Sequence, residues 1–328
     1  PTTRSVAGSA VDIGVIADTI VEPNDTFTVT LIDPHVPGIE FGNKQSIGTI
    51  VNDDCDLPHW PRAASRGDPH LVSFDGLAYD FQAAGEFVLA HGAPTSGIEV
   101  QARMAPMGDL VSNITAIATL IDGHRVTIDT VADQPMRIDG VETVVPADTG
   151  FIQIGSATIA FDGSTYTLID PGRVSLIVQD CGDHLDMVMS ADQSRTGTLT
   201  GLLGNFNGDT TDDLSLADGT VLSQPIRFAD LYGSFANAWR VTQENSLFDY
   251  RPGTTTDTYT DRDFPRMALT LDVLPAELVS RATELVDQAG ITDPTVRAAA
   301  ILDLAVTGDL SYLASAAIPV EPKATVEA

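Results

Sequence analysis

Five Asp-Gly pairs punctuate one stretch of the chain and constrain its fold more than any other feature. They lie between Leu71 and Val221, separated by short runs of apolar and polar residues. The pairs are Asp75-Gly76, Asp122-Gly123, Asp139-Gly140, Asp162-Gly163 and Asp218-Gly219. Asp-Gly between such runs is a strong hairpin signal, because both residues tolerate a positive φ angle. Turns at this density predict a mainly β domain of the β-sandwich kind.

The segments on either side have different patterns. Before the β-rich stretch, DTFTVTLIDP and SIGTIVNDD alternate with the period of two that is typical of half-buried strands. After Pro252 the pattern becomes helical, and two segments each have a proline near the first turn and a glycine after the last. The proline and glycine pairs are Pro275 with Gly290 and Pro294 with Gly308. Asp293 is the expected cap of the second helix, and a third short helix is expected at about 309–317.

The chain therefore divides into five parts. We predict a β fragment, a proline-containing linker without periodicity, a large β domain, a small α-helical appendage and a disordered tail. Their bounds are residues 1–54, 55–66, 67–250, 251–317 and 318–328. The chain opens inside what looks like a domain, so we expect it to be part of a longer protein.

The charge balance is strongly acidic. Seventeen basic residues face 46 acidic ones, for a formal net charge of −29. Such a surface repels nucleic acid and anionic membranes and attracts divalent cations. No apolar run approaches the ~20 residues that a membrane span needs. We therefore expect neither nucleic acid nor a membrane span, and we expect most carboxylates simply to solvate the surface.

One acidic loop concentrates hard oxygen ligands. GLLGNFNGDTTDDLSLADG, residues 201–219, offers five such side chains: Asn205, Asn207, Asp209, Asp212 and Asp213. Calcium takes six to eight oxygens of this kind, some from backbone carbonyls and water. The spacing excludes an EF-hand, since the sixth position from Asn205 lacks glycine and Leu216 stands where the bidentate Glu belongs. Two interpretations stay open, a metal site and an acidic turn.

No fingerprint of a turnover enzyme is present: the chain lacks the H-E-x-x-H, G-x-S-x-G, P-loop and Rossmann patterns. The bond between Asp68 and Pro69, in RGDPHLVSFDGLAYDF, is nevertheless chemically special. An Asp carboxylate can attack its own carbonyl carbon, and a proline amide leaves readily once its nitrogen is protonated. His70 is placed to donate that proton. The alternative is that Asp-Pro merely begins a strand.

These two stretches together resemble the opening and closing signatures of a von Willebrand factor type D domain. The resemblance covers roughly residues 64–250 and includes FANAWRVTQENSLFDY. It implies that calcium is bound by the acidic loop together with the aspartate of the FDG turn. The implied ligands are Asp75, Asn205, Asn207, Asp212 and Asp213, with a backbone carbonyl near Asp209. Some type D domains with G-D-P-H also cleave themselves between Asp and Pro, which here concerns Asp68, Pro69 and His70.

The cysteine content departs from the pattern of the animal members of this family. The positions of their C-x-x-C read Thr200 and Leu203, so the usual disulfide framework is not expected. Cys55 and Cys181 are the whole complement, and they form one disulfide or none.

Residues 11–54 are similar to the C-terminal half of a Calx-β domain. This pairing, the acidity and the few cysteines suggest a large secreted or surface protein of a bacterium. We predict a calcium-stabilised extracellular structural or adhesion module, with Ca²⁺ as its cofactor. Its expected partners are other domains of the parent protein and extracellular matrix or a cell-surface protein or glycan. The alternative function is a self-processing module that cleaves at Asp68-Pro69.

Overall fold

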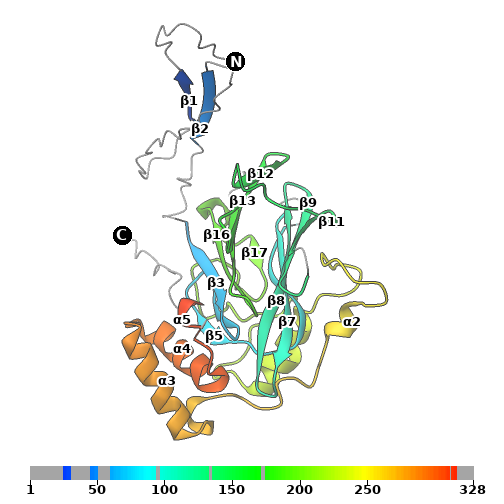
Figure 1. The fold of residues 1–328 in the computed structure, drawn as a ribbon. Coiled ribbons are helices and arrows are strands. Elements are labelled where there is room, and N and C mark those ends of the chain that lie inside the picture. The colour runs from blue at the N-terminus through cyan, green and yellow to red at the C-terminus, as the bar shows by residue number, and fades with distance from the viewer. Residues whose placement is uncertain are drawn as a thin grey trace, which may run out of the picture. The chain divides into compact units, whose positions relative to one another are not determined.

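The chain divides into two compact units, Pro1–His59 and Trp60–Ala328, which are described separately. The computed structural model describes residues 25–30, 45–50, 60–93, 97–132, 135–170, 174–310 and 312–315 (Figure 1). In the first unit, β1 (Asp25–Thr30) pairs antiparallel with β2 (Gln45–Ile50). The rest of the predicted Calx-β fragment lies outside the described residues.

The second unit is built on two antiparallel sheets, which confirms the predicted fold class. The seven-stranded sheet has the order β11-β10-β9-β8-β7-β6-β17. Its strands are β6 (Gly85–Gly92), β7 (Glu99–Met107), β8 (Val111–Ile121), β9 (His124–Asp129), β10 (Met136–Ile138), β11 (Val141–Glu142) and β17 (Leu199–Thr200).

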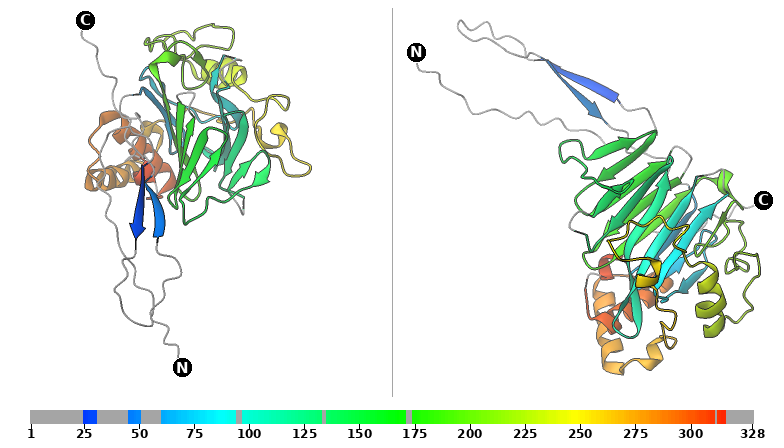
Figure 2. Two further views of the ribbon diagram at one scale, coloured as in Figure 1. Left: turned by 90° about the horizontal axis from the view of Figure 1, so that it is seen from above. Right: turned by 90° about the vertical axis from the view of Figure 1, so that its right-hand side faces the viewer.

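The eight-stranded sheet has the order β12-β13-β14-β15-β16-β3-β4-β5. Its strands are β3 (Arg62–Arg66), β4 (His70–Val72), β5 (Ala78–Asp80), β12 (Phe151–Ile154), β13 (Ala157–Phe161), β14 (Thr165–Asp170), β15 (Val174–Asp180) and β16 (Leu185–Ala191). The two sheets form two layers (Figure 2). One continuous core fills the space between them, with Phe87 and Ile117 from one sheet and Leu71, Leu176 and Met187 from the other.

The predicted Asp-Gly turns join neighbouring strands. Asp122 and Gly123 connect β8 to β9 with φ angles of 47° and 80°, and Asp139 and Gly140 connect β10 to β11 with 51° and 82°. Two consecutive positive φ angles are the requirement of a type I′ hairpin turn, which Asp-Gly meets at low cost.

The predicted linker 55–66 is wrong for its last five residues. Arg62–Arg66 form β3, which lies inside the eight-stranded sheet between β16 and β4. Ala63, Ala64 and Ser65 are fully buried. Because both faces of this strand are covered, it has no alternation for a periodicity argument to find.

Within the described residues, every helix except η2 follows the last strand, β17. The helices are η2 (Gln193–Arg195), the π-helical turn η3 (Asp230–Phe235), α1 (Ala236–Ala238), α2 (Thr256–Tyr259), η4 (Leu271–Val273), α3 (Ala276–Gln288), α4 (Pro294–Thr307) and α5 (Tyr312–Ser315). Within the described part of the chain, no helix is both long and apolar enough to cross a membrane.

The three C-terminal helices, α3 to α5, form the predicted helical appendage. α4 begins at Pro294 as expected, and the Asp293 carboxylate accepts a hydrogen bond from Val296 N–H at 3.0 Å. Helices α3 and α4 share a small apolar core that includes Ala282, Val286 and Leu304. The appendage lies beside the edge of the sheet formed by β3 to β5 (Figure 1).

Candidate functional sites

The first candidate site joins the turn after β4 to the acidic loop after β17. Asp75 lies in that turn and is 6% exposed. Its Oδ2 accepts a hydrogen bond from Asn207 N–H at 3.0 Å, and its Oδ1 accepts one from Gly208 N–H at 2.7 Å. The residues joined are 132 and 133 positions apart in sequence. Asp75 therefore fastens the loop to the eight-stranded sheet.

Asp213 holds the loop from the other side and is 2% exposed. Ser73 Oγ donates to its Oδ2 at 2.6 Å, and Asn205 N–H donates to its Oδ1 at 3.3 Å. Burial raises the pKa of Asp213 to about 6, and the negative charge of Asp75 adds to this effect. A Cβ on Gly204 would lie 2.2 Å from Asp213 Oδ1, so this position requires glycine.

Three more predicted residues close the loop between these aspartates. Asn205 Nδ2 donates to Asp212 Oδ1 at 2.8 Å, and Asn207 Nδ2 donates to Asp212 Oδ2 at 2.9 Å. The structure thus brings Asp75, Asn205, Asn207, Asp212 and Asp213 together in one network. Asp209 is exposed, its carboxylate accepts from Thr211, and its own N–H donates to Asn207 Oδ1 at 2.7 Å.

This donor set fits calcium. It offers carboxylate and amide oxygens, the hard ligands that calcium prefers, and neither imidazole nor thiolate. Two of its carboxylates, Asp75 and Asp213, are buried close enough to repel one another. A bound cation relieves this kind of repulsion.

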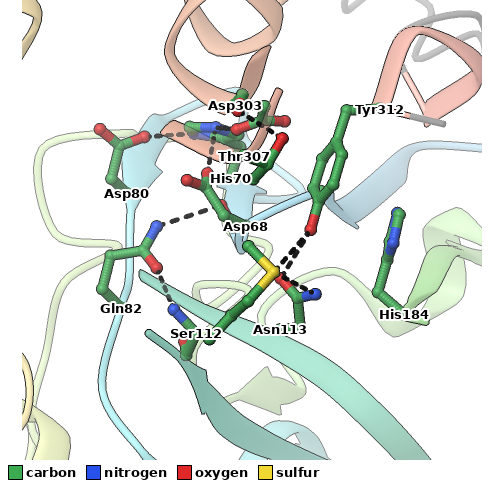
Figure 3. A network of polar contacts seen from close by, with 12 residues as sticks. Asp68, His70, Asp80, Gln82, Ser112, Asn113, His184, Asp303, Thr307 and Tyr312 are labelled. Carbon is green, nitrogen blue, oxygen red and sulfur yellow. Dashed lines mark hydrogen bonds and ion pairs between the residues drawn. The ribbon is translucent and has the colours of Figure 1, made fainter. Parts of the chain in front are cut away.

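The second candidate site surrounds the G-D-P-H stretch between β3 and β4 (Figure 3). Asp68 is fully buried, and His70 Nε2 lies 2.6 Å from its Oδ1. The same nitrogen lies 2.7 Å from Asp303 Oδ1, and His70 Nδ1 lies 2.5 Å from Asp80 Oδ1. One imidazole therefore contacts three carboxylates, two of them buried.

Asp303 was not predicted, and it comes from the helical appendage. It lies on α4 among Ala300, Leu302, Leu304 and Ala305, and it is 3% exposed. Burial raises the pKa of Asp303 well above its ordinary value; His70 opposes this rise and Asp68 adds to it. In the sequence, the one signal for Asp303 as a site residue is its position in an otherwise apolar helical segment. A carboxylate buried there needs a partner.

The pKa of the His70 imidazole is also shifted, but here burial and the neighbouring carboxylates act in opposite directions. Burial alone would lower the pKa of His70, but the carboxylates of Asp303 and Asp68 raise it well above its ordinary value. A charged imidazolium is therefore favoured between these groups.

Gln82 is the second residue that the sequence did not reveal. Its Nε2 donates at 3.1 Å to the backbone carbonyl oxygen of Asp68, the carbonyl of the Asp68-Pro69 bond. Its Oε1 accepts from Ser112 N–H at 2.8 Å, which fixes the orientation of the amide. A glutamine in the connection between two strands carries no distinctive signal, so only the fold reveals this contact.

Tyr312 of α5 anchors the appendage near the same stretch. Its hydroxyl donates to Asn113 Oδ1 at 2.9 Å, and its ring stacks on His184 with the centroids 4.5 Å apart. Gly67 fits closely beneath it, because a Cβ there would lie 2.2 Å from Asp303 Oδ2 and 3.2 Å from Tyr312 Cδ1. The appendage is thus packed directly on the G-D-P-H backbone.

Replacing Gly67 by alanine is expected to loosen this packing. We expect Gly67→Ala to lower the free energy of unfolding by about 1–3 kcal/mol more than Gly197→Ala, because of overpacking against Asp303 and Tyr312. Gly197 is a matched control, with a φ of 67° against 59° and nothing within 4 Å of its Cβ position. Chemical denaturation measures both, and equal losses would show that the appendage packs elsewhere.

The sequence leaves one disulfide or none between the two cysteines, and Cys55 lies outside the described residues. The other cysteine, Cys181, is partly buried, and its Sγ lies 3.8 Å from Asp186 Oδ2. Asp186 Oδ1 in turn accepts from Gly67 N–H at 2.8 Å. The pairing of Cys55 with Cys181 stays a prediction.

Comparison with known proteins supports the type D resemblance. Residues 64–220 match the von Willebrand factor type D domain. Human Sushi domain-containing protein 2 is 30% identical over 218 residues, which cover 61% of this chain and 25% of that protein. Human Mucin-2 is 25% identical over 212 residues, which cover 63% of this chain and 4% of Mucin-2. Hemocytin of Bombyx mori is 25% identical over 182 residues, which cover 53% of this chain and 5% of hemocytin.

These similarities support the predicted type D segment over residues 64–220. They also confirm the predicted secreted or cell-surface location. The chain spans a quarter or less of the length of the three relatives named. All three are animal proteins, and the Calx-β fragment and the bacterial source stay predictions.

Proposed function

We propose that the chain is a calcium-stabilised structural module of a larger extracellular protein. The observation that carries the proposal is the clip formed by Asp75 and the loop 205–213, here called the acidic clip. Its buried carboxylates, Asp75 and Asp213, come from segments far apart in sequence, and each accepts a hydrogen bond from a backbone N–H of the same loop.

The charge of the acidic clip supports a cation. Asp75, Asp212 and Asp213 bring three negative charges, and none of the ion pairs in the described part of the chain involves them. Asn205 and Asn207 add neutral oxygens. In this proposal, calcium supplies the compensating positive charge when bound, while the backbone N–H groups of Asn207 and Gly208 orient the Asp75 carboxylate.

The consequence would be architectural. The clip joins the turn between β4 and β5 to the loop that follows β17, and so ties the edge of one sheet to the end of the other. A chain with two cysteines has few other covalent constraints, and a bound metal can supply the constraint that disulfides supply elsewhere. The module would then present its surface to other domains of the parent protein, and to extracellular matrix or a cell-surface protein or glycan.

A second candidate function is self-processing at Asp68-Pro69, and the contact of Gln82 favours it. In this reaction a carboxylate oxygen of Asp68 attacks its own backbone carbonyl carbon. The bond to Pro69 breaks as its nitrogen takes a proton from His70, leaving a cyclic anhydride at Asp68 and a free N-terminus at Pro69. Water then opens the anhydride. The Gln82 amide, 3.1 Å from the carbonyl oxygen, would stabilise the negative charge that develops there.

The self-processing candidate predicts two fragments, one ending at Asp68 and the other beginning at Pro69. Asp68→Asn removes the nucleophile and is expected to abolish them, whereas Gln82→Met is expected to slow their appearance by about 10²–10³-fold. Denaturing gels and mass spectrometry of samples kept at neutral pH measure this. The control is the same protein unfolded in denaturant; a chain that stays intact when folded, or that cleaves equally when unfolded, contradicts the candidate.

A further inference from the structure

A buried cluster outside the acidic clip has a different set of ligand types. Asp68, His70 and Asp303 each offer one ligand atom, and the three atoms lie within 4.8 Å of one another. The closest approaches are 2.6 Å and 2.7 Å, from His70 Nε2 to the two aspartates (Figure 3). Imidazole with carboxylates suits zinc and related transition metals, whereas calcium prefers oxygen alone.

The charge of this cluster is unbalanced. Asp68 and Asp303 are almost completely buried, and His70 is the one cationic group paired with either of them in the described ion pairs. Both carboxylate oxygens of Asp68 are buried; Oδ1 is paired with His70 Nε2, and Oδ2 has no hydrogen-bond partner among the described residues. Buried carboxylates in this condition need either a shared proton or a cation.

The surroundings also meet the requirements of a metal site. Asp80 Oδ1 lies 2.5 Å from His70 Nδ1, which is the carboxylate–histidine arrangement that orients a ligating imidazole through its second nitrogen. A pocket of about 270 Å³ lies next to the cluster and is lined in part by Asp80, Gln82 and Leu302. Asp80 is half exposed, so the Nδ1 edge of the imidazole lies close to solvent.

We infer that Asp68, His70 and Asp303 form a binding site for a divalent transition metal of the zinc type, distinct from the acidic clip. Metal bonds of about 2.0–2.1 Å put neighbouring ligand atoms roughly 3.3 Å apart, so the two contacts of His70 Nε2 would lengthen by roughly 0.6–0.7 Å when a metal binds. Because Asp303 belongs to α4, the metal would tie the helical appendage to the β domain.

The test is a titration of the chelator-treated chain of residues 1–328 with Zn²⁺ in excess Ca²⁺, followed by calorimetry. Co²⁺ serves as a spectroscopic probe, since its visible absorption reports on nitrogen and oxygen ligation. We expect one Zn²⁺ per chain, no strong site in His70→Gln, and at least a tenfold loss of affinity in Asp303→Asn. Asp80→Asn, a change at a half-exposed residue, is expected to weaken binding by about 10–100-fold without affecting the fold.

The matched control is the exposed pair of His124 and Asp139, whose Nδ1 and Oδ2 lie 2.7 Å apart. His124→Gln is expected to leave Zn²⁺ affinity unchanged. Absence of stoichiometric Zn²⁺ binding to the wild-type protein would overturn the inference. A proton shared between the carboxylates of Asp68 and Asp303 would then compensate their negative charge. Binding that survives in Asp80→Asn and His70→Gln but is lost in His124→Gln would overturn it in favour of a surface site.

Discussion

Removal of calcium is expected to lower the melting temperature of this protein by many degrees. With a micromolar dissociation constant and millimolar external calcium, occupancy stabilises the fold by ~4 kcal/mol, and a chelator removes that contribution. Melting with calcium and with chelator measures the difference. In Asp75→Ala and Asp213→Ala, the calcium-dependent rise should disappear.

The control for this prediction is Asp218→Ala. Asp218 lies in the same acidic region, but its Oδ1 accepts from Thr220 N–H in a separate exposed turn. This variant should keep the full calcium-dependent rise. A rise of equal size in Asp75→Ala, Asp213→Ala and Asp218→Ala would mean that calcium acts on the general negative charge of the surface.

Arg103→Ala is expected to cost about 3–5 kcal/mol of unfolding free energy. Arg103 Nε donates to Glu86 Oε1 at 2.8 Å, and both side chains are almost fully buried. Its guanidinium carbon lies 3.7 Å from the ring centroid of Tyr259 and 4.6 Å from that of Phe248. Removing the arginine leaves Glu86 as an uncompensated buried charge. It also removes the cation–π contacts with Tyr259 and Phe248, which hold the segment around α2 against the sheet.

Arg137→Ala is the matched control for this change. Arg137 donates to Glu142 at 2.8 Å across the β10–β11 pair of the same sheet, but the Glu142 side chain is 57% exposed. Its loss should cost less than about 1 kcal/mol. Urea denaturation gives both values. Similar small losses for the two variants would show that the segment around α2 contributes little to the stability of the β domain.

Local signals in the sequence predict much of this fold. Asp122-Gly123 and Asp139-Gly140 form the turns that their chemistry favours, and the caps at Asp293 and Pro294 define the start of α4. These features depend on neighbouring residues alone, so one sequence is enough to infer them. The wrong linker assignment at 62–66 has the same origin, because a strand covered on both faces leaves no periodic pattern.

The sites required more than local patterns. Hard oxygen ligands in 201–219 indicated the acidic loop, and the type D resemblance added Asp75, which the fold places against Asn207 and Gly208. Asp303 approaches His70 across 233 positions. No local rule connects residues at that distance, and the packing of the appendage on β3 to β5 decides the contact.

Calcium titration of the chelator-treated chain by calorimetry measures binding at the acidic clip itself. We expect one site per chain with micromolar affinity, absent in both Asp75→Ala and Asp213→Ala and retained in Asp218→Ala. Absence of saturable binding, or a site of equal affinity in all three variants, would contradict the acidic clip and leave the loop 205–213 as an acidic turn.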